Sequence, residues 1–297
     1  MHSIATKMYG SSPVFVRALN AARMVAGTDV TVLITGEPGS GKALMAQELH
    51  GASRRVKGRF RMIGCAGIDE RQFEAELMAT PSGSTLYLDE VADLSLEAQA
   101  KLLHFLESVD ARHAGFPDVR VLTSSGADLL SLQMSGQFRE DLYYRLHVVP
   151  LPLPPLRERA DDIVLLLKQF TADLARRHGR KAPRFSVTAR NLLKQYRWPG
   201  NVRELRNFCE RMVILMPGAI VQPADMPLEM RRDAATTASQ PGLFSLPEEG
   251  VDLFALEGDI IRQAICMSGG NRSKAARLLG LTRDTLLYRI QKHAIEI

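Results

Sequence analysis

The sequence predicts a doubly wound α/β domain, followed by a small all-α domain and a C-terminal helix-turn-helix. Short apolar runs alternate with helical patterns over the first half of the chain, which is typical of a parallel sheet covered by helices. From residue 161 to residue 230 the apolar side chains recur only at helical spacing, so this region is predicted to be purely helical. Residues 262–293 carry seven Lys or Arg residues against one acidic residue, Asp284.

Composition excludes a mostly disordered or collagen-like chain. The 297 residues are 45% hydrophobic and 24% charged, as in globular proteins, and this length suggests about two domains. The three cysteines and seven histidines show no metal-ligand spacing, so we expect no zinc site and three buried cysteines. Residues 1–10 do not resemble a signal peptide, and no apolar run approaches the ~20 residues of a membrane span. A cytoplasmic protein without membrane contact is predicted.

Five apolar runs are predicted as strands, at residues 30–35, 60–63, 85–88, 120–123 and 148–151. The first is almost continuously apolar, as expected of a parallel strand buried on both faces. Helical patterns lie between them, for example at residues 43–53 and 96–109. The proline-rich stretch 150–155 cannot continue a helix and marks a boundary. We predict four regions: an α/β region at residues 1–153, a helical region at residues 154–232, a linker at residues 233–252 and the helix-turn-helix at residues 253–297.

A glycine-rich loop lies between the first predicted strand and the next helix. Residues 36–42 fit the pattern G-x-x-x-x-G-K, in which backbone amides and the lysine surround phosphate oxygens. Ala43 stands where many such loops have a Ser or Thr that binds Mg²⁺. The residues predicted to bind the cofactor ATP are Gly36, Glu37, Pro38, Gly39, Ser40, Gly41, Lys42 and Ala43.

Two carboxylates follow the predicted strand 85–88. Asp89 would then lie at the carboxyl edge of the sheet, facing the phosphate loop, and is predicted to hold Mg²⁺. Glu90 is predicted to activate the attacking water. The alternative is an acidic strand end in a surface turn; its position beside a phosphate loop favours the functional interpretation.

Further motifs resemble one family over nearly the whole chain. They are Gly136-Gln-Phe-Arg-Glu-Asp-Leu-Tyr-Tyr-Arg-Leu146, Pro154-Pro-Leu-Arg-Glu-Arg-Ala-Asp-Asp-Ile163 and Trp198-Pro-Gly-Asn-Val-Arg-Glu-Leu205. With the phosphate loop and the acidic pair, they are similar to those of the bacterial enhancer-binding activators, the NtrC-type AAA+ proteins that work with sigma-54 RNA polymerase. The resemblance implies an AAA+ module with a helical lid.

The resemblance also implies roles for several arginines. Arg139 and Arg145 would be offered to ATP in a neighbouring subunit, and Arg203 would sense the nucleotide from the lid of its own subunit. One of the first two could instead be a surface ion-pair partner, and Arg203 could pair with Glu204. Two further arginines of the second motif, at positions 157 and 159, are expected to bridge the two subdomains.

Several departures from the family pattern concern the ATPase site and its output. The family carries a long helical hairpin, tipped by a Gly-Ala-Phe-Thr-Gly-Ala loop that contacts the sigma factor, between positions that correspond to Leu77 and Gly83; here no hairpin is present. Gly64 replaces an Asn that restrains the catalytic Glu, and Ser125-Gly126 replaces a Thr-Asn sensor. No N-terminal receiver domain is expected before the module. We therefore expect retained nucleotide binding, weak hydrolysis and loss of the sigma-54 contact.

The basic C-terminal segment resembles a Fis-type helix-turn-helix. Helices are predicted at residues 253–267, 271–279 and 282–292, with Asn271 and Thr282 as N-caps. Leu286 and Ile290 would pack inward. Residues expected to contact DNA phosphates are Arg272, Ser273 and Lys274. The last helix would enter the major groove with Thr282, Arg283, Thr285 and Arg289 near DNA, and Arg283 is the expected base contact. Relatives pair through the first of these helices, which implies a dimer on a two-fold symmetric site.

The sequence thus predicts a DNA-binding transcription regulator with an ATP-binding module that acts without the usual sigma-54 contact. Its expected partners are double-stranded DNA, further copies of the chain in a dimer or hexameric ring, and RNA polymerase or a complete relative. One alternative is an ATP-hydrolysing activator that remodels sigma-54 polymerase through a different loop. Another is an oligomeric scaffold in which ATP only holds subunits together.

Overall fold

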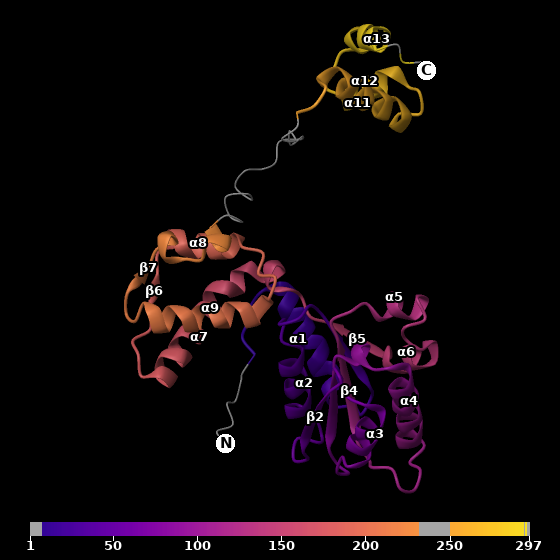
Figure 1. The fold of residues 1–297 in the computed structure, drawn as a ribbon, viewed down its shortest axis with the longest axis vertical. Coiled ribbons are helices and arrows are strands. Elements are labelled where there is room, and N and C mark those ends of the chain that lie inside the picture. The colour runs from indigo at the N-terminus through magenta and orange to yellow at the C-terminus, as the bar shows by residue number, and fades with distance from the viewer. Residues whose placement is uncertain (1–7, 232–249, 294, 296–297) are drawn as a thin grey trace. The chain divides into compact units, whose positions relative to one another are not determined.

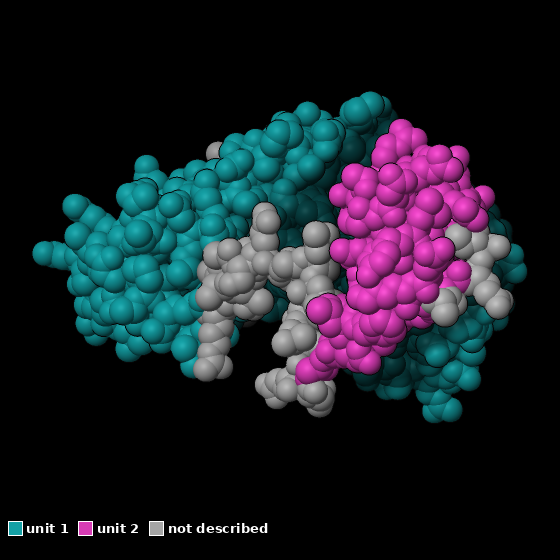
Figure 2. All heavy atoms as spheres, turned by 90° about the horizontal axis from the view of Figure 1, so that it is seen from above, with its two compact units in different colours: residues 1–238 teal, residues 239–297 magenta. Residues whose placement is uncertain are grey.

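The computed structural model describes residues 8–231, 250–293 and 295. The chain divides into two compact units, residues 1–238 and 239–297, drawn in different colours in Figure 2. The predicted linker lies almost entirely outside the described residues. Each unit is therefore described by itself.

The first unit is built on a five-stranded parallel sheet with the order β2-β3-β4-β1-β5 (Figure 1). The strands are β1 (Val32–Thr35), β2 (Phe60–Gly64), β3 (Thr85–Asp89), β4 (Arg120–Ser125) and β5 (Val149–Pro152). All five predicted strands are confirmed, with ends that differ by one or two residues. Because the strands are parallel, β1, β3 and β4 bring their carboxyl ends to one edge, where the phosphate loop and the acidic pair follow.

Helices cover both faces of this sheet, as a doubly wound fold requires. They are α1 (Pro13–Ala26), α2 (Lys42–Gly51), α3 (Glu70–Met78), α4 (Leu96–Asp110), α5 (Leu129–Met134) and α6 (Glu140–Leu146). Successive residues of β1 point to opposite faces: Ile34 packs in a cluster with α1 and α2, while Leu33 packs in a cluster with α3, α4 and α6. Figure 1 shows these two groups of helices on opposite sides of the strands.

A short turn connects α3 to β3. Only residues 79–84 separate the end of α3 at Met78 from the start of β3 at Thr85, so the long hairpin of the family is absent, as predicted. The turn is anchored by Gly83, whose N–H donates to the Asp118 carbonyl at 2.7 Å. Thr80 and Ser84 are buried on either side of its exposed tip.

The helical region of the first unit contains α7 (Ala160–His178), α8 (Val187–Gln195) and α9 (Asn201–Leu215). They pack around Trp198, which is fully buried and donates from Nε1 to the Leu193 carbonyl at 2.9 Å. The prediction of a purely helical pattern was wrong in one detail. β6 (Arg184–Phe185) pairs in parallel with β7 (Ile220–Val221), and runs of two residues are too short to give a period in the sequence.

The described part of the second unit contains three helices, α11 (Leu253–Met267), α12 (Arg272–Leu278) and α13 (Arg283–Lys292). Both predicted N-caps are confirmed: Asn271 accepts from the Lys274 N–H, and Thr282 accepts from the Thr285 N–H. Leu286 and Ile290 pack against α11 and α12, as predicted.

The cysteine prediction was correct for two of three residues. Cys65 and Cys209 are buried in the first unit, whereas Cys266, near the end of α11, is exposed. The prediction for Cys266 failed because a helix of a small domain has only one face covered. Among the described residues, no helix is both long and apolar enough to cross a bilayer.

Candidate functional site

The glycine-rich loop runs from the end of β1 to the start of α2. Gly39 and Gly41 have φ of 78° and 109°, in the left-handed region that glycine adopts without strain, and Gly41 is the N-cap of α2. Ser40 is 2% exposed, and its buried hydroxyl meets no hydrogen-bond partner within the described chain. A buried polar atom of this kind, at a helix N-terminus, is suited to an anion.

Lys42 is held at the centre of the loop by an acidic partner. Its Nζ lies 2.7 Å from Glu90 Oε1 and donates to the Gly36 carbonyl, also at 2.7 Å. The other carboxylate oxygen of Glu90 accepts from the Gly126 N–H at 2.5 Å. A Cβ on residue 126 would lie 3.2 Å from Glu90 Oε2 and 3.4 Å from Lys42 Nζ, so the absence of a side chain at Gly126 leaves room for the ion pair.

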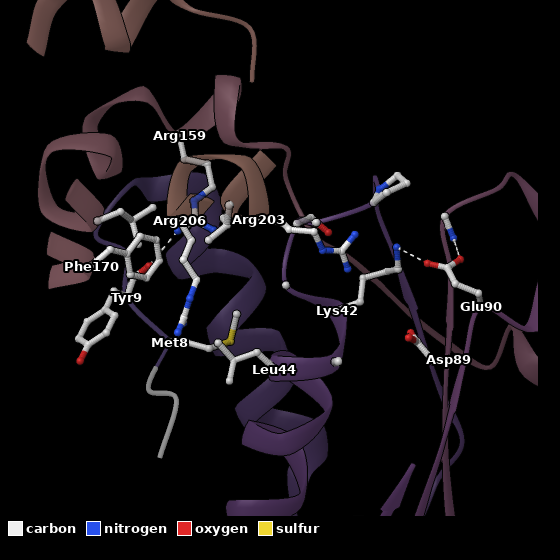
Figure 3. Close-up of a pocket in the computed structure, with 18 of the residues that line it drawn as sticks. Met8, Tyr9, Lys42, Leu44, Asp89, Glu90, Arg159, Phe170, Arg203 and Arg206 are labelled. Carbon is white, nitrogen blue, oxygen red and sulfur yellow. Dashed lines mark hydrogen bonds and ion pairs between the residues drawn. The ribbon is translucent and has the colours of Figure 1, made fainter. Parts of the chain in front are cut away.

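Asp89 points into the same region from the end of β3 (Figure 3). Its Oδ1 accepts hydrogen bonds from the Tyr87 hydroxyl at 2.7 Å and from Ser124 Oγ at 2.8 Å. The Ser124 hydroxyl also accepts the Glu90 N–H at 3.1 Å. Glu90 has φ of 58°, a left-handed conformation that is uncommon for residues other than glycine and that turns the chain sharply after the strand.

The helical region is fastened directly to the phosphate loop. The Gly39 carbonyl accepts from the Val202 N–H at 3.0 Å, at the start of α9. The Asn201 amide donates to Glu37 Oε2 at 3.0 Å and to the Pro38 carbonyl at 3.1 Å. The two bonded side chains of Arg157 and Asn201 lower the pKa of Glu37 from 4.5 to about 2. A Cβ on Gly39 would collide with the Gly200 carbonyl, so this close approach requires glycine.

Two arginines before α7 bridge the subdomains, as predicted. Arg157 forms two hydrogen bonds to the Glu37 carboxylate, at 2.6 and 2.8 Å. Arg159 is buried, pairs with Asp162 at 3.0 Å and lies with its guanidinium carbon 3.8 Å from the centre of the Phe15 ring. Both are thus engaged by the protein itself.

A cavity of about 1380 Å³ opens between the phosphate loop and the helical region (Figure 3). Lys42 and Arg203 line it together with the apolar side chains of Leu44, Phe170 and Leu174. The guanidinium carbon of Arg206 lies 6.0 Å from the centre of the Phe170 ring, so cations and apolar groups alternate along the wall. Figure 3 shows Arg206, one turn after Arg203 on α9, reaching toward Met8. A cavity with cations beside an apolar wall matches the phosphates and base of a nucleotide.

Among the described residues, no group of three or more His, Cys, Asp or Glu side chains could hold a metal ion by itself. Asp89, Glu90 and Asp93 line the cavity nonetheless. Mg²⁺ in proteins is commonly held by one or two carboxylates together with substrate phosphates, so this donor set fits a cation that arrives with a nucleotide.

The arginines predicted to serve a neighbouring subunit do not line the cavity of their own chain. Arg139, the N-cap residue of α6, pairs with Asp141 at 2.7 Å. Arg145, on α6, pairs with Asp110 at the end of α4. Both are therefore engaged in surface ion pairs in the isolated chain. The predicted alternative of an ion pair between Arg203 and Glu204 does not occur: the Glu204 carboxylate accepts instead from the Tyr196 hydroxyl and the Gly200 N–H.

In the second unit the predicted DNA-contacting residues differ in their surroundings. The exposed ones are Arg272, Ser273, Lys274, Thr282 and Arg283. The hydroxyl of the half-buried Thr285 lies 2.7 Å from that of Thr282. Arg289 is half-buried and pairs with Glu257 of α11, a carboxylate that His293 also contacts at 3.0 Å. The pair with Glu257 sets Arg289 apart from the other predicted contacts.

The first helix of this unit carries an exposed apolar stripe. Leu253, Ile260 and Met267 recur every seven residues on α11 and are 76%, 44% and 74% exposed. Side chains at this spacing lie on one face of a helix, a pattern typical of helices that pair with another helix.

Sequence reasoning missed four residues that shape the site: Tyr87, Ser124, Asn201 and Arg206. Asn201 lies within the motif that begins at Trp198, and Arg206 follows this motif directly, so position relative to Arg203 was an available signal. Tyr87 and Ser124 are on different strands, and only the sheet order brings their hydroxyls together.

Comparisons with known proteins cover both units. A family model described as a sigma-54 interaction domain matches residues 9–156. A model of the AAA+ ATPase lid domain matches residues 157–242, and a model of the Fis family of bacterial regulatory proteins matches residues 254–293.

Individual proteins match most of the chain. The transcriptional regulatory protein ZraR of Salmonella typhimurium is 36% identical over 96% of this chain and 68% of its own length. The alginate biosynthesis transcriptional regulatory protein AlgB of Pseudomonas aeruginosa is 39% identical, over 95% of this chain and 66% of its own length. The crystal structure of NtrX from Brucella abortus in complex with ATP superposes with a TM-score of 0.70, at 30% identity, over 98% of this chain and 70% of that one.

Proposed function

The chain belongs to the family of NtrC-type AAA+ regulators with a sigma-54 interaction domain and a Fis-type helix-turn-helix, and from this premise we propose that it binds ATP and DNA to regulate transcription without the usual sigma-54 contact. The observation that carries ATP binding is the phosphate loop, with an unpartnered buried Ser40 hydroxyl and Lys42 beside a cavity of about 1380 Å³. The crystal structure of NtrX contains ATP, which supports the same ligand here.

The residues around the cavity have distinct roles in this proposal. The loop amides and Lys42 bind the phosphates, and Arg203 approaches them from α9. Asp89 would hold Mg²⁺ that arrives with the nucleotide, and such a cation would supply positive charge beside the phosphates. Glu90 orients the attacking water, for which its carboxylate first has to leave Lys42.

Arg139 and Arg145 are proposed to complete the site of a neighbouring copy. Both lie on or beside α6, outside the cavity of their own chain, and both are partly exposed. Each guanidinium exchanges its carboxylate partner, Asp141 or Asp110, for a phosphate in the neighbour. This exchange makes hydrolysis depend on assembly, and it makes hydrolysis weak where a neighbour is missing.

DNA binding is assigned to the second unit. The N-terminal end of α13 presents Thr282 and Arg283 for base edges, while Arg272 and Lys274 of α12 contact phosphates. The exposed stripe on α11 supports pairing of two copies, which suits a two-fold symmetric site with half-sites about 34 Å apart.

A second candidate function is an activator that remodels sigma-54 polymerase through another loop. It is favoured by one observation: Glu90, Arg139, Arg145 and Arg203 are all present, although binding alone does not need them. The short turn at residues 79–84 favours the first proposal, because it leaves no hairpin to reach the sigma factor.

The test is ATP binding by the parent and by Lys42→Ala, measured by equilibrium dialysis. Loss of a charge-assisted contact to phosphate costs about 1.5–3 kcal/mol, so we expect the affinity to fall about 10- to 100-fold. Lys101→Ala is the matched control, since Lys101 is an exposed lysine paired with Glu74 on another face. Equal ATP affinity of the parent and Lys42→Ala would refute the phosphate-loop assignment. Footprinting on the upstream DNA of its own gene, with and without ATP, tests the regulatory proposal.

A further inference from the structure

Two buried hydroxyl groups, those of Tyr87 and Ser124, form hydrogen bonds with the acidic pair Asp89-Glu90. Tyr87 and Ser124 are 0% exposed, and their oxygens lie 2.9 Å apart across the contact between β3 and β4. Both hydroxyls are within hydrogen-bond distance of the same carboxylate oxygen, Asp89 Oδ1.

The hydroxyl groups of Tyr87 and Ser124 carry one proton each. Ser124 has one proton, which it donates to Asp89, and it accepts the Glu90 N–H. Tyr87 has one proton, which goes either to Asp89 Oδ1 or to Ser124 Oγ. In both arrangements Oδ1 is the Asp89 oxygen that accepts from this cluster, directly from Ser124 and either directly or through Ser124 from Tyr87, and Oδ2 is left for a ligand in the cavity.

We propose that Tyr87 and Ser124 are positioning residues that fix Asp89 for one-oxygen binding of a divalent cation carried by a nucleotide. This inference rests on the proposed ATP binding. Hydrogen-bonded partners of a metal-binding carboxylate set its orientation, and their loss typically lowers metal affinity. Neither residue touches the nucleotide or the cation; both act through Asp89.

Ser124 has a second task that Tyr87 lacks. By accepting the Glu90 N–H it supports the left-handed turn that aims the Glu90 side chain at Lys42. Removing its hydroxyl therefore leaves a half-buried N–H without its acceptor, in addition to freeing Asp89. The serine is expected to matter more than the tyrosine.

The experiment measures the Mg²⁺ concentration at which ATP binding is half-maximally tightened, starting from protein and ATP in EDTA. Tyr87→Phe keeps the ring, which stacks on Phe60 at 6.0 Å between centroids, and removes only the hydroxyl. We expect about 10-fold more Mg²⁺ to be required for Tyr87→Phe and still more for Ser124→Ala, with unchanged ATP binding in EDTA. Mn²⁺ as a second probe should show the same order.

Thr123→Val is the matched control. Thr123 precedes Ser124 on β4, is equally buried, and donates its hydroxyl to the Val32 carbonyl at 3.3 Å, away from the acids. An unchanged Mg²⁺ requirement for this control, together with the shifts above, supports the inference. Equal requirements in the parent, Tyr87→Phe and Ser124→Ala would overturn it while leaving ATP binding intact, and so would a comparable shift in Thr123→Val. A parent that binds no ATP in EDTA or in Mg²⁺ would overturn the proposed function instead.

Discussion

Gly126 decides where the Glu90 carboxylate rests. Because residue 126 has no side chain, the Glu90 carboxylate has room to form an ion pair with Lys42. This ion pair competes with the phosphates of a nucleotide for the Lys42 ammonium group. Gly126→Ala adds a methyl group 3.2–3.4 Å from both Glu90 oxygens and from Lys42 Nζ, so these atoms have to shift by a few tenths of an ångström and the ion pair is weakened. A partly exposed pair of this kind contributes up to ~1 kcal/mol, and we expect Gly126→Ala to bind ATP about two- to fivefold more tightly.

Gly64→Ala provides the comparison for this substitution. Gly64 ends β2 at the same edge of the sheet, and a Cβ there would meet no atom within 4 Å. Its ATP affinity, measured by the same dialysis, should equal that of the parent. Glu90→Gln should resemble Gly126→Ala, because it removes the charge that holds Lys42. Weaker ATP binding by both Glu90→Gln and Gly126→Ala would contradict competition between carboxylate and phosphate.

For single residues, the sequence predicts which side chains form the site better than it predicts how those side chains are arranged. The loop and the acids could be located because each is a contiguous motif beside a strand. The resting place of Glu90 could not, since Lys42 and Gly126 are far from it in the chain and meet it only when β1, β3 and β4 align. The exposed position of Cys266 was missed because composition does not say which face of a helix is covered.

Among the elements, those with a strong local signal were predicted well. The predicted helix at residues 253–267 coincides with α11, and the caps of α12 and α13 are the residues predicted from their type. Strand ends shifted by one or two residues because pairing partners, rather than propensity, end a ladder. β6 and β7 could not be predicted, since each is two residues long and is defined only by its partner.

Helices α12 and α13 are expected to contribute differently to DNA binding. Arg283 is the first residue of α13, where two guanidinium donors can reach a guanine edge, so Arg283→Ala should cost roughly 1–3 kcal/mol and relax preference at one base position. Lys274→Ala should weaken all DNA alike and reduce the salt slope by about 1. The measurement is affinity for the specific site and for random DNA at two salt concentrations.

Arg262→Ala is the control that distinguishes the loss of a positive charge in this unit from the loss of a direct DNA contact. Arg262 is exposed on α11 and pairs with Asp259, so its loss should alter the affinity for specific and random DNA little. If Arg283→Ala weakens both DNAs equally while Lys274→Ala changes selectivity, the two roles are assigned the wrong way round. If no residue of 253–297 in the intact chain forms a crosslink to DNA, the helix-turn-helix assignment is refuted.

For the whole molecule, the shared-site proposal predicts complementation between two defective variants. Lys42→Ala has a damaged cavity but intact arginines, and Arg145→Ala has the reverse. Each alone should show only background ATP turnover, because an arginine finger contributes about 10³-fold or more. Mixed together, neighbours of opposite type form working sites, so turnover should reappear and rise with total protein concentration.

Arg112→Ala is the appropriate control for Arg145→Ala. Arg112 is exposed after α4, and its loss should leave turnover unchanged. Turnover that is independent of protein concentration in the parent would argue for a site complete within one chain. Absence of turnover in every mixture, with ATP still bound, would favour the scaffold alternative.

The short turn between α3 and β3 has a consequence for protein engineering. Its tip, Pro81 to Gly83, is exposed, while Thr80 and Ser84 remain anchored in the interior on either side. Exposed tips between buried anchors are the positions where inserted segments are tolerated best. A chimera that receives a relative's hairpin between Pro81 and Ser82 would change one surface peptide bond and leave the cavity untouched. The turn is thus a suitable insertion site for a hairpin that extends toward a polymerase.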